Sequence, residues 1–562
     1  MQPIISAKQM REIDRLTTQN YHIPSLHLMQ AAAAACLQAI AANFSGNLEG
    51  KKAQILCGTG NNGGDGAALA QEFSRVGVHA DVLLFGTVDQ TRGDARTNFE
   101  IVRRLSGFGA GSNDSPSSLS FVECDSLRVW AELAQPRRTF DIIVDALFGT
   151  GLTRPLEGVN LQVVQHLEMT RRARDESSTA RPLIVSIDIP SGLNADLANR
   201  IGEAVQADLT VTFTAPKPAN VIPPACHLNG KLVVADIGSP SALIEAANSL
   251  LFVTEEKDVR DWLVSTRYIP NSFKNMHGHA LVIAGSRGYT GAAVLCGNAA
   301  MKSGAGLVTV AAPASAQTSI AGSIMPEVMT TALAETDRGA VSDEAFDHAM
   351  QLAAKASALA IGPGLSSQDD RTRSFVLSVV KQRKTAVVID ADALNCLVIN
   401  SSDGCPTDLF GSNEAPLILT PHPGEMLRLL GATDKSALDD SVAVARAFAT
   451  THKLILVLKG SRSLVAAPDG RVFINPTGNA GIGTAGSGDT LTGIIVGFIA
   501  QAVATLKGKA DALSATLAAV YIGGLAGDFA ARRLGMRTMV ASDIREHLSE
   551  AIQSLDPTGE QP

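Results

Sequence analysis

The stretch 478-GNAGIGTAGSGDTLTGIIVGF-498 joins a glycine-rich loop to an apolar segment, with one acidic residue, Asp489, at the junction. The segment after Asp489 is rich in Leu, Ile and Val, which predicts a buried helix and argues against a flexible linker. Gly486, Ser487 and Gly488 can bring backbone N–H groups close to a phosphate, and the start of a helix adds partial positive charge. The stretch therefore predicts a phosphate-binding loop that opens a helix.

Asp489 is expected in the first turn of that helix, where a carboxylate can cap the helix or accept a proton. A cap alone does not require the glycine run that precedes it. We therefore interpret Asp489 as a general base, with helix capping as the alternative. A base of this kind contributes roughly two to four orders of magnitude to a reaction rate.

The length and composition of the chain exclude several classes of protein. At 562 residues the chain exceeds one ordinary domain, so two or more domains are expected. The net charge of −8 argues against a general nucleic-acid binder. The seven cysteines form no CxxC pair, which favours a reducing, cytoplasmic compartment. The N-terminus lacks an apolar signal region and the Ala-rich run 31–42 is too short to span a bilayer, so we expect no membrane partner.

Short apolar runs alternate with longer helical patterns along the whole chain. These runs are continuous in Val, Ile and Leu, which is typical of parallel strands covered by helices on both faces. The pattern predicts an α/β fold with two three-layer parallel-sheet domains. The predicted strands are 53–57, 81–85, 141–147, 183–188, 209–213 and 232–237 in the first half, and 280–285, 307–312, 357–362, 386–391, 416–420 and 454–460 in the second.

The strand pattern restarts after the first six predicted strands. We therefore predict one domain at 1–245, a linker at 246–264 and a second domain at 265–555. The acidic and proline-bearing tail at 556–562 is expected to fray. The polar stretch 109–120 lies between strands of one unit and is interpreted as a surface insertion.

The sequence 58-GTGNNGGDG-66 follows a predicted strand and contains the GxGxxG pattern of dinucleotide-binding folds. A dinucleotide site also needs an acidic residue at the end of the next strand. The only acid of that strand, Asp81, stands at its start. Amide and carboxylate groups in a glycine bend can hold a cation, a ligand hydroxyl or a phosphate. We interpret the loop as a phosphate or cation site rather than a plain turn.

Two further polar loops follow predicted strands of the same sheet. The loop 145-DALFGTGLTR-154 begins with Asp145, and 188-DIPSGL-193 begins with Asp188 and contains Ser191. Ligands bind outside the carboxyl ends of parallel strands, so three polar loops at this edge indicate a site. A single Asp at a strand end would more often be a helix cap.

The motifs GNNGGDG, VDALFGTGLTR and SIDIPSGL, in this order and spacing, resemble the NAD(P)H-hydrate epimerase domain, a Rossmann-like fold, over about residues 5–240. The resemblance implies proton transfer by Asp188 and a K⁺ ion held by Asn62, Asp145 and Ser191, whose oxygen atoms suit a weakly charged cation. It implies that substrate lies along Asn61, Asn62, Gly63, Gly64 and Asp65 and along Gly149, Thr150, Gly151, Leu152, Thr153 and Arg154.

The second half contains no GxxxxGK[ST] motif, which excludes a Walker A loop. The sequence GTAGSGD instead resembles the anion-hole loop of ribokinase-like kinases, in which the aspartate accepts the proton of the phosphorylated hydroxyl. Two further loops fit such a site. The loop 420-TPHPGEM-426 holds His422 between two prolines, and 459-KGSRS-463 places Lys459 at a strand end, where it suits nucleotide phosphates.

With 285-GSRGYTGAAVL-295, 301-MKSGAGLVTV-310, 362-GPGL-365 and 390-DAD-392, these motifs resemble the ADP- or ATP-dependent NAD(P)H-hydrate dehydratase over about residues 265–555. The resemblance implies that Asp489 is the base and that Mg²⁺ accompanies the nucleotide. It implies substrate binding by Ala292, Gly364, His422 and Asp489. It implies nucleotide binding by Lys459, Gly460, Ser461, Arg462, Ser463, Gly486, Ser487 and Gly488.

Several positions depart from the family patterns, and 274-KNMHG-278 stands where the dehydratase family often has HKG. Gln30 and Ala32 stand where the epimerase family usually has Glu and Gly. Gly523, in 521-YIGGLAGD-528, stands where the dehydratase family often has His, so no role passes to a side chain at this position.

Together the resemblances imply a repair enzyme that epimerises the R and S hydrates of NADH and NADPH and dehydrates the S form. A hydroxyl leaves poorly, so phosphorylation from ADP precedes elimination. The alternative is a ribokinase-like kinase for a vitamin precursor, fused to a ligand-binding domain without chemistry. The residues leave open ATP in place of ADP, and also a possible homo-oligomer.

Overall fold

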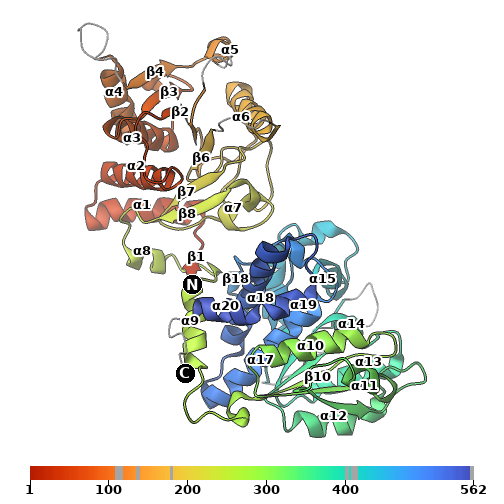
Figure 1. Cartoon of the computed structure of the whole chain (residues 1–562). Coiled ribbons are helices and arrows are strands. Elements are labelled where there is room, and N and C mark those ends of the chain that lie inside the picture. The colour runs from red at the N-terminus through yellow and green to blue at the C-terminus, as the bar shows by residue number, and fades with distance from the viewer. Residues whose placement is uncertain are drawn as a thin grey trace. The chain divides into compact units, whose positions relative to one another are not determined.

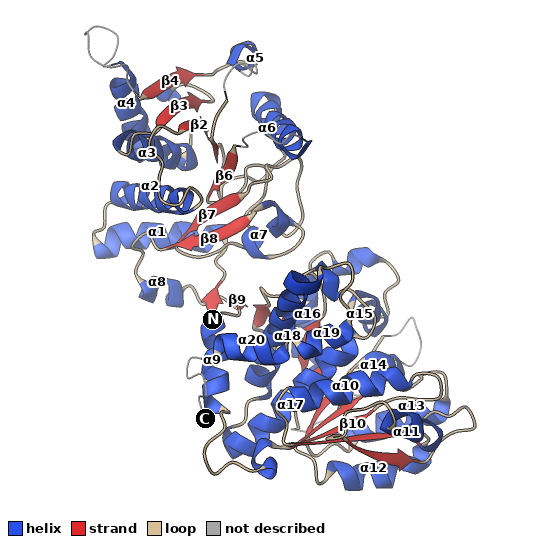
Figure 2. Cartoon of the chain, in the orientation of Figure 1, coloured by secondary structure: helices blue, strands red, loops and turns tan. Residues whose placement is uncertain are grey.

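The computed structural model describes residues 1–107, 118–133, 139–176, 182–398, 404–406, 410 and 415–556. The chain divides into two compact units, Pro3–Ser249 and Leu250–Pro562, the second including Met1–Gln2. Each unit is an α/β domain built on one sheet, with its strands enclosed by helices (Figures 1 and 2). The predicted fold class is therefore confirmed.

The first unit contains a seven-stranded sheet in the order β4-β3-β2-β5-β6-β7-β8, and all its pairs are parallel. The chain runs outward in both directions from the β2–β5 pair, which is where α/β sheets bind ligands. The strands are β2 (Lys52–Cys57), β3 (His79–Leu84), β4 (Leu119–Glu123), β5 (Ile142–Ala146), β6 (Leu183–Ile187), β7 (Leu209–Phe213) and β8 (Lys231–Ala235).

Helices cover both faces of this sheet (Figure 1). One buried cluster joins the sheet to α2, α3 and α4, and another joins it to α5 and α6. The helices of this unit are α1 (Ala7–Tyr21), α2 (Ser25–Ala42), α3 (Asn61–Arg75), α4 (Gly93–Gly107), α5 (Leu127–Leu133), α6 (Gly158–Glu176), α7 (Pro218–Val221) and α8 (Ser241–Ala246).

The second unit is built on an eleven-stranded sheet in the order β1-β9-β18-β17-β16-β15-β14-β13-β10-β11-β12. Strand β17 is antiparallel to both its neighbours, which adds an antiparallel hairpin to the predicted parallel sheet. The strands are β1 (Gln2–Pro3), β9 (Leu251–Val253), β10 (His279–Ile283), β11 (Leu307–Pro313), β12 (Met329–Leu333), β13 (Ala358–Ile361), β14 (Ala386–Ile389), β15 (Leu417–Leu419), β16 (Ile455–Leu458), β17 (Leu464–Ala466) and β18 (Val472–Ile474).

Helices α10, α17 and α18 share the largest buried cluster of the second unit with one face of its sheet. Helices α12 and α13 lie on the other face (Figure 1). The helices of this unit are α9 (Glu256–Ser265), α10 (Thr290–Lys302), α11 (Ala314–Ala321), α12 (Phe346–Ala353), α13 (Asp370–Lys381), α14 (Ala391–Cys396), α15 (Pro423–Leu430), α16 (Ser441–His452), α17 (Ser487–Leu506), α18 (Ala512–Leu534), α19 (Ala541–Glu546) and α20 (Leu548–Leu555).

Two connecting segments differ from the sequence predictions. In the predicted linker 246–264, β9 pairs with β18 and α9 buries Trp262, whose ring stacks on Phe498 with centroids 4.4 Å apart. Hydrogen bonding and aromatic packing thus hold most of this segment in the second domain. In the predicted insertion 109–120, the last two residues begin β4, and residues 109–117 lie outside the described part, as do residues 557–562 of the predicted tail.

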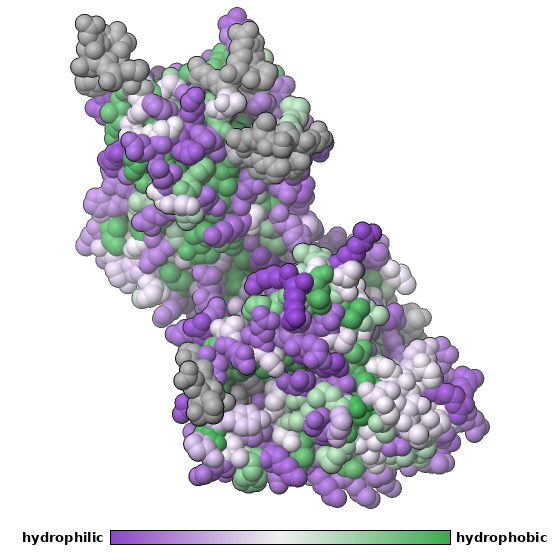
Figure 3. Space-filling view, viewed as in Figure 1, coloured by the Kyte–Doolittle hydropathy of each residue, from purple (hydrophilic) through white to green (hydrophobic). Residues whose placement is uncertain are grey.

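Three helices are long and apolar enough to cross a membrane, judged by length and composition: Ser25–Ala42, Ser487–Lys509 and Ala512–Leu534. The last two bury 67% of their most apolar windows inside the structure, as expected for helices that are apolar all round and lie in a core. The first buries 33% and includes the Ala-rich run, so that helix is longer than predicted. The face of the molecule in Figure 3 is mostly hydrophilic, with scattered hydrophobic areas.

Candidate active sites

A cavity of about 600 Å³ lies at the carboxyl edge of the first sheet. Its wall comes from the loops after β2 and β5, the residue after β6, and helices α1 and α2. The sequence-predicted residues that line it are Asn61, Asn62, Asp65, Gly149, Thr150, Gly151, Leu152 and Asp188. The three polar loops predicted to converge therefore meet around one cavity.

Four of the predicted substrate-binding residues in these loops do not line this cavity. Thr153 and Arg154 are exposed, whereas Gly63 and Gly64 are buried. A Cβ on Gly63 would lie 1.8 Å from Gly58 O, and one on Gly64 would lie 2.8 Å from the Ala95 Cα. These glycines let the start of α3 pack closely beneath the cavity.

Asp188 is fixed in an uncommon backbone conformation at the end of β6. Its φ of 64° lies in the left-handed region, which costs of order 1–3 kcal/mol for a residue other than glycine and often marks a functional site. Its Oδ1 accepts hydrogen bonds from Lys217 Nζ at 2.6 Å and Thr212 Oγ1 at 2.9 Å. Asn220 Nδ2 donates to the Asp188 carbonyl at 3.3 Å. The buried lysine therefore holds this carboxylate in a charged pair.

Three other carboxyl groups of the described residues line the cavity, from Asp14 on α1, Asp65 on α3 and Asp94 on α4. Burial raises the pKa of Asp14 to about 6; the charge of Lys217 opposes this rise and that of Asp188 adds to it. Burial raises the pKa of Asp65 well above its usual value, and the charges of Asp188 and Asp14 raise it further. Protonated carboxyl groups are thus favoured beside the charged Asp188–Lys217 pair.

Asp145 is a fully buried carboxylate near the end of β5. Its Oδ2 accepts hydrogen bonds from Ser186 Oγ and Ser191 N, both at 2.8 Å. Burial raises its pKa against the effect of these bonds. Among the described residues no basic side chain forms an ion pair with it. A buried carboxylate without a basic partner is a favourable neighbour for a cation.

The other residues of the predicted K⁺ site lie around the adjacent loop. Ser191 Oγ donates to Phe148 O at 3.2 Å and accepts from Phe148 N at 2.9 Å. A Cβ on Gly149 would lie 3.2 Å from Asn62 Oδ1. In the described part, no cluster of three His, Cys, Asp or Glu side chains suits a metal ion. The donors around this loop are the Asn62 amide, the Ser191 hydroxyl and backbone carbonyl oxygens. Such oxygen donors fit a weakly charged cation.

In the second domain, Asp489 occupies the first turn of α17, after Gly486 with φ 86°. This left-handed φ favours glycine, and a Cβ on Gly486 would lie 2.4 Å from Leu295 Cδ1 on α10, so a larger residue would also displace that side chain. No hydrogen bond of the described residues involves the Asp489 carboxyl, which weakens the capping alternative. Burial raises its pKa to about 7, with Asp390 adding and Lys459 opposing. Such a pKa suits a general base near neutral pH.

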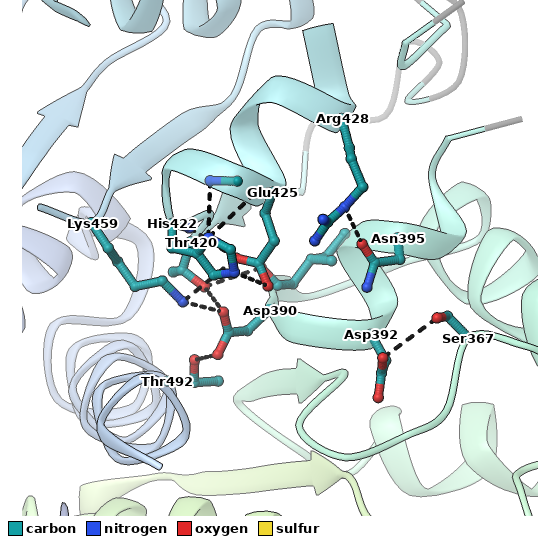
Figure 4. A network of polar contacts seen from close by, with 12 residues as sticks. Ser367, Asp390, Asp392, Asn395, Thr420, His422, Glu425, Arg428, Lys459 and Thr492 are labelled. Carbon is teal, nitrogen blue, oxygen red and sulfur yellow. Dashed lines mark hydrogen bonds and ion pairs between the residues drawn. The ribbon is translucent and has the colours of Figure 1, made fainter. Parts of the chain in front are cut away.

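A buried polar network surrounds Asp390 (Figure 4). The charges of Asp390 and Lys459 in this network act on Asp489. Asp390 Oδ1 accepts from Lys459 Nζ and from Thr420 Oγ1, and Oδ2 accepts from Thr492 Oγ1, each at 2.8 Å. Burial opposes ionisation of Asp390, but Lys459 and the hydroxyl donors together lower its pKa. A Cβ on Gly488 would lie 3.1 Å from Lys459 Nζ, so the lysine lies against the anion loop.

His422 precedes α15 and caps it (Figure 4). Its Nδ1 accepts from Gly424 N at 3.0 Å and Glu425 N at 3.3 Å, and Glu425 Oε2 accepts from His422 N at 2.8 Å. Burial, Lys459 and Arg428 lower the pKa of His422, so the ring is neutral with its proton on Nε2. The imidazole can therefore donate one hydrogen bond to a ligand.

The remaining predicted residues of this domain fall into two places. Gly364, with φ 61°, lies against α10: a Cβ there would be 3.0 Å from Ala292 Cβ and 2.7 Å from Tyr289 O. Ala292 lies one turn before Leu295, which contacts the anion loop at Gly486. Gly460, Ser461, Arg462 and Ser463, predicted to bind nucleotide, form the turn between β16 and β17, directly after Lys459.

Known families match both domains. Residues 280–550 match the family described as NAD(P)H-hydrate dehydratase, and residues 25–219 match the YjeF-related protein N-terminus. A bifunctional NAD(P)H-hydrate repair enzyme of Moorella thermoacetica is 38% identical, covering 98% of this chain and 97% of that protein. The chain belongs to the bifunctional NAD(P)H-hydrate repair enzymes. The Escherichia coli enzyme of that name is 31% identical, over 89% of this chain and 84% of its own length.

Solved structures also resemble the dehydratase half of this repair enzyme. An ADP/ATP-dependent NAD(P)H-hydrate dehydratase from Bacillus subtilis, co-crystallized with ATP/Mg2+, is 29% identical with a TM-score of 0.46. The match covers 54% of this chain and 99% of the Bacillus subtilis chain. The family membership confirms the resemblance found from the motifs and does not support the alternative of a vitamin-precursor kinase.

Sequence reasoning missed four charged residues of the repair enzyme's first cavity: Arg11, Asp14, Asp94 and Lys217. Lys217 follows β7, and the same rule about carboxyl ends of strands points to it. Asp14 comes from α1, which precedes the matched region 25–219 and carries no glycine loop or strand end. Gly523, the departure noted above, faces Leu491 and Ile494 of α17, with distances of 3.5 and 3.4 Å from a Cβ placed there.

Proposed function

We propose that this repair enzyme epimerises NADH and NADPH hydrates in the first cavity and dehydrates the S form at the Asp489 site, with ADP as phosphoryl donor. The observation that carries the second assignment is the partly buried carboxyl of Asp489, with a pKa of about 7, beside Lys459 and a glycine loop at a helix start. This combination places a base, a cation and backbone N–H groups at one point.

In the dehydration, Asp489 takes the proton of the substrate hydroxyl while the hydroxyl oxygen attacks the terminal phosphorus of ADP. A P–O bond forms, the bond to the other phosphate breaks, and AMP leaves. The lone pair of the ring nitrogen then expels phosphate, and loss of a ring proton restores NAD(P)H. Mg²⁺ carried by the nucleotide would neutralise phosphate charge.

The surrounding side chains orient the two substrates of this step. Lys459, held by Asp390, and the start of α17 bind the transferring phosphate. The turn Gly460–Ser463 extends the nucleotide site from Lys459. Ala292 and Gly364 supply a small-residue surface for the hydrated ring, and His422 donates a hydrogen bond from Nε2.

In the epimerisation, Asp188 accepts the proton of the hydroxyl on the carbon that also bears the ring nitrogen. The loops Asn61–Asp65 and Gly149–Arg154 hold the coenzyme around the cavity. Asn62, Asp145 and Ser191 would hold K⁺, which supplies positive charge beside the buried Asp145. The seven free, buried cysteines support a reducing, cytoplasmic location for the enzyme.

To test this function, the enzyme is incubated with ADP and a mixture of R and S NADH hydrates. The absorbance of reduced nicotinamide measures the recovery of NADH. We expect complete recovery of NADH, with AMP and phosphate as products, and slower turnover with ATP. With Asp188→Ala, recovery should stop near half, because only the S form reacts. No recovery by the wild-type chain with either nucleotide would refute the dehydratase assignment.

A further inference from the structure

The donors that hold Asp188 have no hydrogen left for a substrate. Lys217 Nζ carries three hydrogens and donates one to Asp188 Oδ1 at 2.6 Å. It donates the other two to Thr212 Oγ1 at 2.9 Å and to Phe213 O at 3.1 Å. Among the described residues Asp188 Oδ2 accepts no hydrogen bond, and it lies 3.4 Å from a Cβ placed on Gly149. Asp188 can thus take a proton from a ligand, but Lys217 cannot give one.

Epimerisation of the hydrate requires an acid as well as a base. When a base takes the hydroxyl proton, the O–H electron pair forms a carbonyl, and the C–N bond breaks with its electrons moving to the ring nitrogen. That nitrogen must receive a proton. The ring closes when the nitrogen adds to the opposite face of the carbonyl, and both protons return. With Lys217 fully bonded, the acid must come from another group of the cavity.

Asp14 is placed to fill this need. Helix α1 starts at a capping box in which Ser6 and Gln9 bond each other's backbone, and this fixes the entry of the helix. One turn apart on the same face, Met10 and Asp14 both line the cavity. Asp14 Oδ1 is shielded from solvent, with no hydrogen-bond partner in the described part of the chain. A buried polar atom of this kind needs a partner, and the cavity's ligand can supply it.

On the basis of the proposed epimerase function, we propose that Asp14 is the general acid of the first cavity and acts together with Asp188 as the base. In ring opening, Asp14 gives its proton to the ring nitrogen while Asp188 takes the hydroxyl proton. In ring closure both transfers reverse, so the two carboxyl groups finish as they began. The burial that raises the pKa of Asp14 to about 6 keeps part of it neutral near pH 7.

Asp65 is the other cavity carboxyl with a raised pKa, and its environment suits a different task. Burial raises its pKa well above its ordinary value, and the charges of Asp188 and Asp14 add to the rise, while Lys217 opposes it. Two neighbouring carboxyl groups thus hold the proton on Asp65, which suits a steady hydrogen-bond donor better than a group that cycles its proton. The charged groups that line the cavity with Asp14 are Arg11, Asp65, Asp94, Asp188 and Lys217. Of these, Lys217 lowers the pKa of Asp14 and Asp188 raises it.

The test is Asp14→Asn in the full chain. Purified S-NADH hydrate is incubated with the enzyme in the absence of nucleotide, and chromatography measures its conversion to the R form. We expect the rate to fall by about 10²-fold or more. Dehydration of the S hydrate with ADP, which uses the Asp489 site, should stay at the wild-type rate. The wild-type epimerisation rate should fall as pH rises above about 6, and this dependence should vanish in Asp14→Asn. Asp14→Glu should restore part of the rate.

Glu12→Gln is the matched control, because Glu12 lies on the same helix, exposed and paired with Arg15. It should leave the rate and pH profile unchanged. The proposal would be overturned if Asp14→Asn kept the wild-type rate and pH profile. It would also be overturned if Asp65→Asn lost the pH dependence while Asp14→Asn kept it. If Asp14→Asn does not fold, a flat wild-type profile between pH 5 and 8 overturns it. A wild-type chain that epimerises nothing refutes the proposed function instead.

Discussion

Thr492 Oγ1 donates a hydrogen bond to Asp390 Oδ2 over 2.8 Å, which ties the first turns of α17 to the end of β14. Asp489 lies three residues before Thr492, on the same side of the helix. The other oxygen of Asp390 accepts from Lys459. One buried carboxylate therefore positions both the proposed base and the proposed phosphate-binding lysine, although these come from distant parts of the chain.

Asp390→Asn should weaken both the fold and nucleotide binding. The change removes the nearer charged partner of Lys459, whose side chain is 19% exposed, and leaves the ion pair with Glu425 Oε2 at 3.9 Å. Breaking a buried pair costs about 3–5 kcal/mol, and the remaining contact with Glu425 should reduce this cost. We expect a lower unfolding temperature of the second domain and a higher KM for ADP. Asp469→Asn is the control, because it breaks an exposed pair with Arg471 that contributes about 1 kcal/mol or less. Equal losses in the two variants would contradict the positioning role.

The pH dependence of dehydration should follow the ionisation of Asp489. Burial first, and the charge of Asp390 second, raise its pKa to about 7, while Lys459 opposes them and Asp392 and Glu425 add smaller effects. A base acts only when ionised, so kcat for the S hydrate should rise with pH through about 7 and then level off. Measurement of kcat from pH 5.5 to 9 checks this. Asp390→Asn should move the midpoint to lower pH, and a midpoint below 5 in the wild type would exclude the assignment.

The same raised pKa predicts a cost in stability at high pH. Because the folded pKa of Asp489 lies above its unfolded value near 3.8, folding favours the protonated form. This contribution is full below about pH 3.8 and is lost as pH rises through about 7. Asp489→Asn should therefore raise the unfolding temperature at pH 8 more than at pH 5, while it reduces kcat by roughly 10²–10⁴-fold. A lower unfolding temperature at pH 8 would contradict this account.

Much of the architecture could be predicted from local sequence patterns. All twelve predicted strands form, because continuous Val, Ile and Leu runs suit strands buried on both faces. The loops after β2, β5 and β6 meet because the carboxyl ends of parallel strands share one edge. Six strands in the described part of the chain were missed. Strands β1, β9, β17 and β18 have only two or three residues, too few to show a period. Strands β4 (LSFVE) and β12 (MTTAL) have five residues, but Ser and Thr interrupt their apolar runs.

Long-range partners could not be predicted in the same way. The bond between Asp390 and Thr492 joins residues 102 positions apart, and neither residue type marks it locally. Likewise, Asp14 reaches the first cavity because α1 packs beside it, and the sequence of α1 resembles that of any amphipathic helix. Side chains placed by packing between distant elements thus escape motif analysis, whereas residues on strand-end loops do not.

The proposed K⁺ site predicts an ion-specific effect on the first domain alone. An ion that binds only the folded state stabilises it by about 2.7 kcal/mol at 100 times its Kd. K⁺ should therefore raise the unfolding temperature of this domain and its epimerisation rate relative to choline, without changing dehydration. Asp145→Asn should abolish both responses, because it removes the buried charge that the cation offsets. Asp141→Asn, which alters the part-exposed carboxylate just before the same strand, should keep them. An undiminished response to K⁺ in Asp145→Asn would place the ion elsewhere.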